Sequence, residues 1–154
     1  KGRPKIFIAD AAIRSAVLMI DDVLSDEQEL GAMVETTVYK HLVSFYQGST
    51  AQLGYYRKAK NNQKEVDVVV QLPREKILCE VKYRNHSQLP ATDAIVELCR
   101  DETSGVTSAF LVTKRLEDFG VTRHETSVPI FRVPAIVFLY LLGKMEAEGQ
   151  NGKL

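Results

Sequence analysis

Two neighbouring stretches of the chain alternate ionisable and apolar residues in a pattern suited to metal chemistry. The first, predicted as a strand over 66–72, carries Asp67, and the second, predicted over 76–83, carries Glu80 and Lys82. Successive side chains of a strand point to opposite faces of its sheet. We therefore expect Asp67 on one face of the first strand, and Glu80 and Lys82 together on one face of the second.

A short turn joins the two stretches and sets their register. A tight hairpin pairs Leu72 with Glu75, which places Asp67 opposite Glu80 with Cβ atoms ~4.5–5.5 Å apart. Two carboxylates this close repel each other, and a divalent cation between them removes that repulsion. Mg²⁺ is typically held by one or two carboxylates, with waters and substrate phosphate completing its shell. The pattern thus predicts a Mg²⁺ site, with Lys82 holding or deprotonating a water beside the metal.

Surface ion pairs are the alternative interpretation of these charges, and each would stabilise the fold by only ~0–1 kcal/mol. Val69 and Leu78 fall on the same predicted face as the charges, which favours a sheet that is covered on both sides. Charged groups inside a covered sheet need a partner or a function. Glu35 lies at the edge of the apolar stripe of a helix predicted over 31–46, either as a third ligand or as an ordinary flanking charge.

Hydrophobic periodicity predicts the elements that would position these residues. A first helix follows Asp10 as its N-cap, and a second begins at Ser25, where Gln28 completes a capping box. The remaining predicted elements are strands at 53–56, 66–72, 76–83, 108–113 and 130–133, a helix over 91–103, and a last helix from Pro134. Their order indicates an α/β fold whose mixed sheet contains an antiparallel three-strand meander, a crossover helix and further strands, flanked by helices.

Composition excludes several classes of protein. The chain has 154 residues, 45% of them hydrophobic, with 20 basic and 20 acidic side chains, which is typical of one folded domain and excludes intrinsic disorder. No run of ~18 apolar residues is present, so no membrane span is expected. Cys79 and Cys99 match no zinc or disulfide spacing and are expected to be free thiols. Without a signal peptide, a cytoplasmic location is expected.

Basic residues gather in the sequence near the predicted metal site, and they could grip a phosphate backbone. An ordinary solvated hairpin loop is the alternative for most of this cluster. The candidate nucleic-acid-binding residues are Arg57, Lys58, Lys60, Lys64 and Arg84.

The order of Glu35, Asp67 and Glu80-Val81-Lys82 resembles the PD-(D/E)xK nuclease superfamily, which has a restriction-endonuclease-like fold. The resemblance implies that Asp67 and Glu80 bind Mg²⁺, with Mn²⁺ as a substitute, and that Glu35 adds a metal ligand from the preceding helix. It also implies that Lys82 assists the attacking water. The sequence departs from the family pattern in one place, because Asp67 is not preceded by proline.

A longer set of motifs is similar to the C-terminal domain of prokaryotic AAA-type ATP-binding proteins. These motifs are Gly31-x-x-Val34-Glu35, Tyr56-Arg57, Glu65-Val66-Asp67, Glu80-Val81-Lys82 and the segment 130–135. The similarity implies a lead-in segment over 1–24 from a preceding ATPase region, a nuclease-like domain over 25–146 and a disordered tail over 147–154. ATP would bind only in that N-terminal region, since no G-x-x-x-x-G-K-[ST] loop occurs here.

Two functions stay open at this point. One is Mg²⁺-dependent hydrolysis of phosphodiester bonds in nucleic acid, by Glu35, Asp67, Glu80 and Lys82. The other is a non-catalytic docking or regulatory module of the ATPase that binds protein or nucleic acid. The pattern predicts no oligomeric state.

Overall fold

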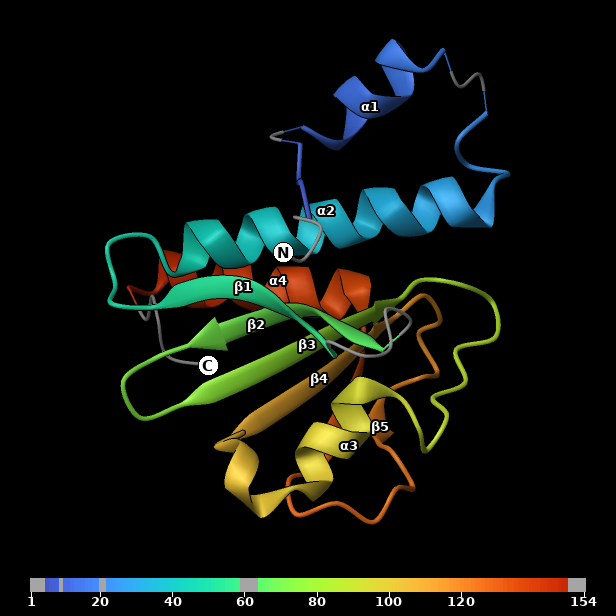
Figure 1. The fold of residues 1–154 in the computed structure, drawn as a ribbon. Helices are drawn as coiled ribbons and strands as arrows, with labels where there is room; N and C mark the ends of the chain where they lie inside the picture. Colours follow the sequence, from blue (N-terminus) through green and yellow to red (C-terminus); the bar gives the residue numbers. More distant parts are fainter. Residues whose placement is uncertain (1–4, 9, 20–21, 59–63, 150–154) are drawn as a thin grey trace.

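A six-stranded sheet with helices on both faces forms the body of the protein (Figure 1). The computed structural model describes residues 5–8, 10–19, 22–58 and 64–149. The strands are β1 (Gln52–Arg57), β2 (Glu65–Gln71), β3 (Lys76–Lys82), β4 (Ser108–Thr113), β5 (Gly120–Val121) and β6 (Ile130–Pro134). The helices are α1 (Ala11–Val17), α2 (Glu27–Phe45), α3 (Ala94–Arg100) and α4 (Ala135–Ala147), with a 3₁₀ turn, η1, over Glu102–Ser104.

The strand order is β1-β2-β3-β4-β6-β5. Strands β1, β2 and β3 form an antiparallel meander, whereas β3, β4 and β6 run parallel and β5 pairs antiparallel with β6 at the edge. The chain crosses from β3 to the parallel β4 through α3, as a parallel connection requires. The predicted mixed α/β fold is therefore confirmed, and its arrangement is consistent with the restriction-endonuclease-like class.

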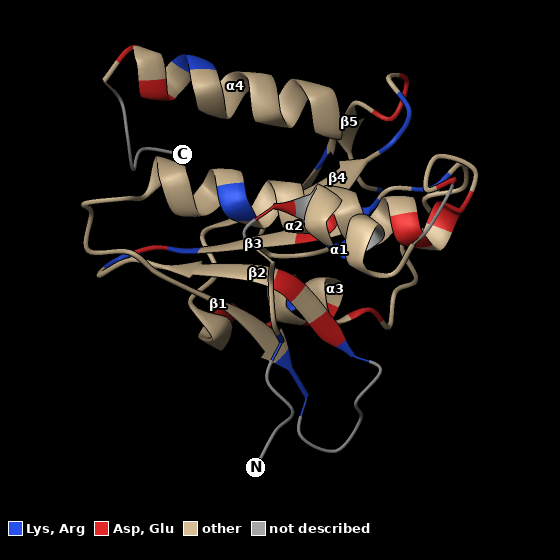
Figure 2. Cartoon of the chain, turned by 90° about the horizontal axis from the view of Figure 1, so that it is seen from above, with Lys and Arg blue, Asp and Glu red and all other residues tan. Residues whose placement is uncertain are grey.

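Helices cover the sheet on both sides, which gives the protein two hydrophobic cores. Helices α2 and α4 lie side by side on one face and α3 lies on the other (Figures 1 and 2). Leu42 and Phe138 belong to the core under α2 and α4, and Ile95 and Leu78 to the core under α3. A sheet that is covered on both faces is what the apolar residues Val69 and Leu78 led us to expect.

Cys79 and Cys99 are both buried free thiols, as predicted. In the part of the chain that the structure describes, no helix combines the length and the apolar character needed to cross a bilayer.

Aspartate caps start the first two helices. Asp10 accepts a hydrogen bond from the backbone N–H of Ala12 and caps α1, as predicted. The predicted cap of the second helix is wrong by one residue, because Asp26 accepts from the N–H groups of Gln28 and Glu29. Ser25 instead donates its hydroxyl to a backbone carbonyl of the preceding turn, so the expected capping box does not form.

Two element boundaries and one strand also differ from the prediction. Helix α3 is shorter than the predicted 91–103, because the chain tightens into η1 and turns at Gly105, whose φ of 72° suits glycine. Strand β5 was not predicted, since two residues carry no periodic pattern. Of the predicted tail over 147–154, residues 150–154 lie outside the described residues, and α4 extends to Ala147.

A β-bulge in β2 shifts the alternation of its side chains. Gly54 of β1 pairs with Val69, but Tyr56 pairs with Val66, so one residue of β1 faces two residues of β2. As a result, Val66 packs in the core under α3 while Val68 packs in the core under α2 and α4. Regular alternation along a strand over 66–72 places Val66 and Val68 on the same face, so the bulge separates two side chains that the sequence pattern puts together.

Truncating a core side chain of α3 tests this packing. Ile95 is fully buried, whereas Ile136 of α4 is 69% exposed. We expect Ile95→Ala to lower the free energy of unfolding by about 2–5 kcal/mol, because it removes buried apolar surface and leaves a cavity. The matched control Ile136→Ala should change it by less than about 0.5 kcal/mol. Urea denaturation measures both values, and equal effects would contradict the placement of α3.

Candidate functional site

The predicted site residues lie where β2 and β3 stop pairing. Leu72 donates its backbone N–H to the carbonyl of Glu75 at 2.8 Å, which confirms the predicted register of the hairpin. The paired residues extend along the two strands as far as Val68 and Cys79. The next positions along this register are Asp67 and Glu80, which the sequence pattern predicted to lie opposite each other.

At this point the side chain of Asp67, in place of a backbone carbonyl, accepts the next hydrogen bond from β3. Its Oδ2 accepts a hydrogen bond of 2.9 Å from the backbone N–H of Val81. Its Oδ1 accepts from the ammonium of Lys5 at 2.9 Å, although the two residues are 62 positions apart in sequence. The Asp67 residue is only 7% exposed, so these two contacts hold its carboxylate in place.

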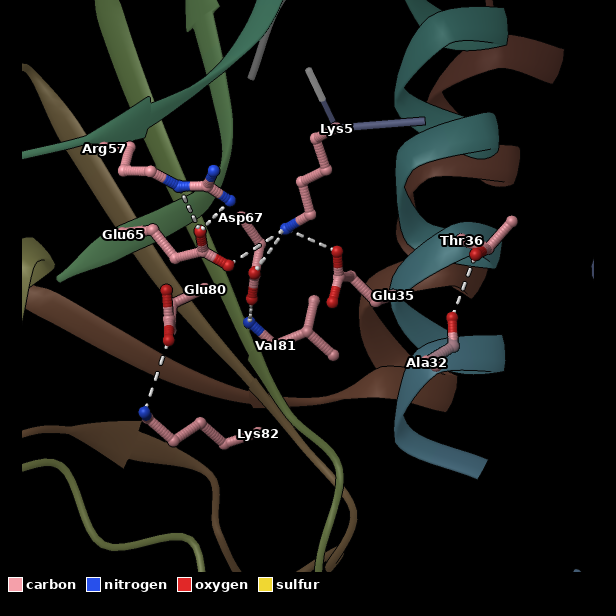
Figure 3. Close-up of polar contacts among 10 residues, drawn as sticks. All are labelled: Lys5, Ala32, Glu35, Thr36, Arg57, Glu65, Asp67, Glu80, Val81 and Lys82. Atoms are coloured by element: carbon pink, nitrogen blue, oxygen red, sulfur yellow. Dashed lines mark hydrogen bonds and ion pairs between the residues drawn. The ribbon is translucent and has the colours of Figure 1, made fainter. Parts of the chain in front are cut away.

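Lys5 lies among three carboxylates. Its Nζ is 2.6 Å from Oε1 of Glu35, 2.9 Å from Oδ1 of Asp67 and 3.7 Å from Oε1 of Glu65 (Figure 3). Glu35 reaches this point from α2, while Asp67 and Glu65 come from β2. The structure thus brings Glu35 and Asp67 together through a lysine ammonium, and Asp67 faces the α2 side of the sheet.

Glu80 and Lys82 form a second group on the other side of the sheet. Glu80 follows Leu78 by two residues and therefore shares its side, which faces α3. Lys82 Nζ is 3.3 Å from Oε1 of Glu80 and 3.0 Å from Oδ2 of Asp93, the N-cap residue of α3. In Figure 3 the Glu80 side chain points toward Lys82 and away from Glu35.

The expectation that Asp67 and Glu80 share one face is therefore wrong. The bulge in β2 is the physical reason, because it turns Asp67 toward α2, whereas β3 keeps its regular alternation. The two carboxyl groups still influence each other, as the protonation of Glu80 shows.

Burial raises the pKa of Glu80 from its ordinary 4.5 to about 8, and the negative charge of Asp67 adds to this shift. The ammonium of Lys82 offsets only part of it. One oxygen of Glu80, Oε2, is buried without a hydrogen-bond partner. The negative charge of an ionised Glu80 would therefore be only partly balanced, by Lys82, and one of its oxygens would lack a hydrogen bond.

Glu35 and Lys5 compensate each other more closely. Burial and the charge of Asp67 raise the pKa of Glu35, and the bond to Lys5 counteracts that rise. Burial alone would lower the pKa of the Lys5 ammonium, but Asp67 and Glu35 raise it overall. Lys5 therefore stays charged and neutralises much of the negative charge that gathers here.

These residues suit a Mg²⁺ ion that is held by one or two carboxylates, and they do not form a site of three protein ligands. Among the described residues, no three His, Cys, Asp or Glu side chains are grouped so that they could hold a metal ion. Mg²⁺, however, commonly takes only one or two carboxylates and completes its shell with water and phosphate oxygens. Glu80, with its unsatisfied Oε2, provides a donor of that chemistry, whereas the carboxylates of Asp67 and Glu35 are both held by Lys5.

Sequence reasoning did not identify Lys5, Glu65 or Asp93 as members of these two groups. Lys5 and Asp67 are too far apart in sequence for any local spacing to connect them. Asp93 could have been recognised as the residue before a helix, but its pairing with Lys82 depends on how α3 docks on β3.

The basic loop between β1 and β2 is paired with acidic residues. Arg57 donates to Oε2 of Glu65 at 2.9 Å and 2.7 Å, which joins the start of β2 to the end of β1 (Figure 3). Lys58 and Lys64 both donate to the carboxylate of Glu97 on α3. The positive charge that the sequence placed here is largely offset by these two glutamates.

Arg84 differs from this loop. It follows β3, is exposed, and its side chain forms no hydrogen bond or ion pair with another described residue. Lys60, the remaining basic candidate, falls outside the described residues. Of the five basic candidates, Arg84 is thus the one seen with its charge uncompensated.

Removing the Lys5 ammonium tests whether it holds the carboxylates together. We expect Lys5→Met to lower the free energy of unfolding by about 1–3 kcal/mol at pH 7, because partly buried carboxylates lose their counter-charge. Lys144→Met is the matched control, since Lys144 is exposed and forms a single long ion pair, with its Nζ 3.8 Å from Oε1 of Glu148. Thermal and urea unfolding measure both. A Lys5→Met protein as stable as the control would contradict this arrangement.

The pH dependence of stability tests the environment of Glu80. In the folded protein its carboxyl holds a proton up to about pH 8, whereas in the unfolded chain it loses that proton near 4.5. The folded state then binds more protons between these values, so its stability should fall as pH rises from about 4.5 to about 8, by at most ~1.4 kcal/mol per pH unit. Glu80→Gln should remove this fall, whereas Glu125→Gln, at an exposed position, should retain it.

Comparison with known proteins places the chain in a family. No curated protein matches the sequence. A family model does match, over residues 30–133, and this range contains Glu35, Asp67, Glu80 and Lys82. The match covers more than half of the chain and runs from α2 to β6. The chain therefore belongs to the family described as a domain of unknown function (DUF4143).

Proposed function

We propose that this domain is nuclease-like and hydrolyses phosphodiester bonds of nucleic acid with the help of Mg²⁺. The observation that carries the proposal is Glu80, a buried carboxyl with an unsatisfied oxygen, in contact with Lys82 and influenced by Asp67. A carboxyl group with such a strongly raised pKa beside specific charged partners is typical of functional sites. The resemblance to PD-(D/E)xK nucleases assigns roles to the same three residues.

Glu80 would hold the metal ion, and Asp67 would join it at the point where β2 and β3 stop pairing, once Lys5 releases the Asp67 carboxylate. The ion would supply Lewis-acid polarisation of the scissile phosphate and a bound water of lowered pKa. Lys82, whose ammonium Glu80 and Asp93 hold, would orient the attacking water. Its positive charge would also offset the negative charge that develops on the phosphate in the transition state. Glu35 would contribute as a further ligand once its carboxylate is released from Lys5.

We also propose that the domain follows an AAA-type ATP-binding region in a longer protein, as its motif order suggests. The lead-in segment supports a connection between that region and the site, because it carries Lys5. Two residues later, the ring of Phe7 stacks on Tyr39 of α2, with centroids 3.9 Å apart. A movement of this segment would therefore change the charge around Glu35 and Asp67.

A non-catalytic docking or regulatory module is the second candidate. It is favoured by the ion pairs of Lys5, which already neutralise Glu35 and Asp67, and by the separation of Asp67 and Glu80 on two sides of the sheet. Such a module would keep the fold and bind protein or nucleic acid without cleaving it.

A nuclease assay with DNA and RNA substrates in Mn²⁺ or Mg²⁺ distinguishes the two candidates. If the domain is a nuclease, Asp67→Asn and Lys82→Ala should each reduce cleavage by roughly 10²-fold or more, because each removes a group that acts on the reacting phosphate or water. The control Glu125→Gln, at an exposed position, should cleave like the wild type.

Thermal unfolding gives a second readout that does not depend on turnover. Mn²⁺ should raise the melting temperature of the wild type, since a ligand that binds only the folded state stabilises it. The Asp67→Asn protein should not gain this stabilisation, because an amide is a poorer ligand for a hard cation. A wild type that neither responds to metal nor cleaves would leave the non-catalytic module as the function.

A further inference from the structure

A row of hollows begins beside the candidate site, at the carboxyl end of β3, and extends to the segment that follows β5. The first hollow, of about 430 Å³, is lined by residues that include Glu35, Lys82 and Arg84. The second, of about 520 Å³, shares Lys82 and Arg84 with the first. The third, of about 700 Å³, shares His86 and Gln88 with the second. Since neighbouring hollows share lining residues, we treat the row as one trough.

The second and third hollows are positively charged, although the whole chain has no net charge. Their lining contains five basic side chains and two carboxylates. The basic residues are Lys82, Arg84, Arg115, Arg123 and Arg132, and the acidic ones are Asp93 and Asp118.

Ion pairs leave part of this charge available. Arg132 is held at 2.6 Å from Asp118 and at 3.0 Å from the hydroxyl of Ser87, yet its Nε–H is buried without an acceptor. Arg84 and Arg123 are exposed, and within the described ranges their side chains form neither a hydrogen bond nor an ion pair. The trough therefore offers at least two guanidinium groups whose donors are unused.

The basic loop between β1 and β2 offers fewer free hydrogen-bond donors to a phosphate. Its Lys58 and Lys64 share the carboxylate of Glu97, and Arg57 is bound to Glu65. A phosphate that approached this loop would have to displace carboxylates that already occupy the donors. Charge complementarity to an anionic backbone thus favours the trough over the loop.

We propose that this trough binds the phosphodiester backbone of a nucleic-acid strand and leads it to the candidate site. Guanidinium groups bind phosphate oxygens through paired hydrogen bonds, and Arg84 and Arg123 are the side chains that provide them. Gln88 adds a neutral hydrogen-bonding group of the kind that contacts phosphates without reading bases. The inference rests on the proposed nuclease function, whose substrate class it specifies, and it assigns the contacts to residues that the sequence had mostly left out.

Fluorescence anisotropy with labelled 20-nucleotide DNA and RNA oligonucleotides tests this binding. The measurement is made on the 154-residue chain in EDTA, so that binding is observed without hydrolysis. We expect the double variant Arg84→Glu, Arg123→Glu to weaken binding at least ~10-fold and to lower the slope of log K against log salt by ~1–2. Arg74→Glu is the matched control, because Arg74 is an exposed arginine in the turn at the opposite end of β3 and should bind like the wild type.

Each result decides the inference. A selective loss in the double variant, with an unchanged melting temperature, supports the trough for whichever oligonucleotide binds. Binding that survives the double variant, that is lost equally in Arg74→Glu, or that the wild type lacks altogether overturns it. The proposed hydrolysis fails separately, through absence of metal-dependent cleavage by a protein that still binds the oligonucleotide. Comparison of Lys58→Glu with the double variant shows whether the loop, and not the trough, carries any binding that survives.

Discussion

The carboxylate of Asp67, buried at the point where β2 and β3 separate, is the group around which the rest of the candidate site is arranged. It completes the strand pairing through the N–H of Val81, and it binds the ammonium of Lys5. Its negative charge reaches Glu35 on one side of the sheet and Glu80 on the other, where it contributes to the raised pKa of both groups. A single buried charge therefore links two clusters that no direct contact joins.

The compensation of that charge is unequal on the two sides of the sheet. Toward α2, Lys5 holds Glu35 and Asp67 in short contacts, so the negative charges there are balanced. Toward α3, Lys82 divides its ammonium between Glu80 and Asp93, and one oxygen of Glu80 stays without a partner. Burial without full compensation is costly for stability, and it is common where a protein retains a group for its chemistry. This asymmetry is why we propose Glu80 as the functional centre and treat Lys5 as the internal counter-ion.

The architecture places this centre at the end of the sheet where ligands of open α/β folds usually bind. Strands β3, β4 and β6 run parallel, so their carboxyl ends meet at one edge, and the loop that follows β3 carries Arg84. Ligands of such sheets typically occupy the crevice outside these strand ends. Covering the sheet on both faces confines access to that edge, because α2 and α4 close one side and α3 closes the other. The same packing that stabilises the domain thus restricts where a substrate could reach Glu80.

Local patterns in the sequence were enough to predict every strand except β5, most of the helices, the Asp10 cap and the Leu72–Glu75 register, because these depend on residues close together along the chain. They were also enough to single out Glu80 and Lys82, whose spacing on β3 is regular. Only the tertiary structure decided that Asp67 turns toward α2, since the bulge arises from how β2 pairs with β1. The partners Lys5 for Asp67 and Glu97 for Lys58 and Lys64 were likewise decided by long-range packing, because an ion pair between distant residues leaves no periodic trace in the sequence.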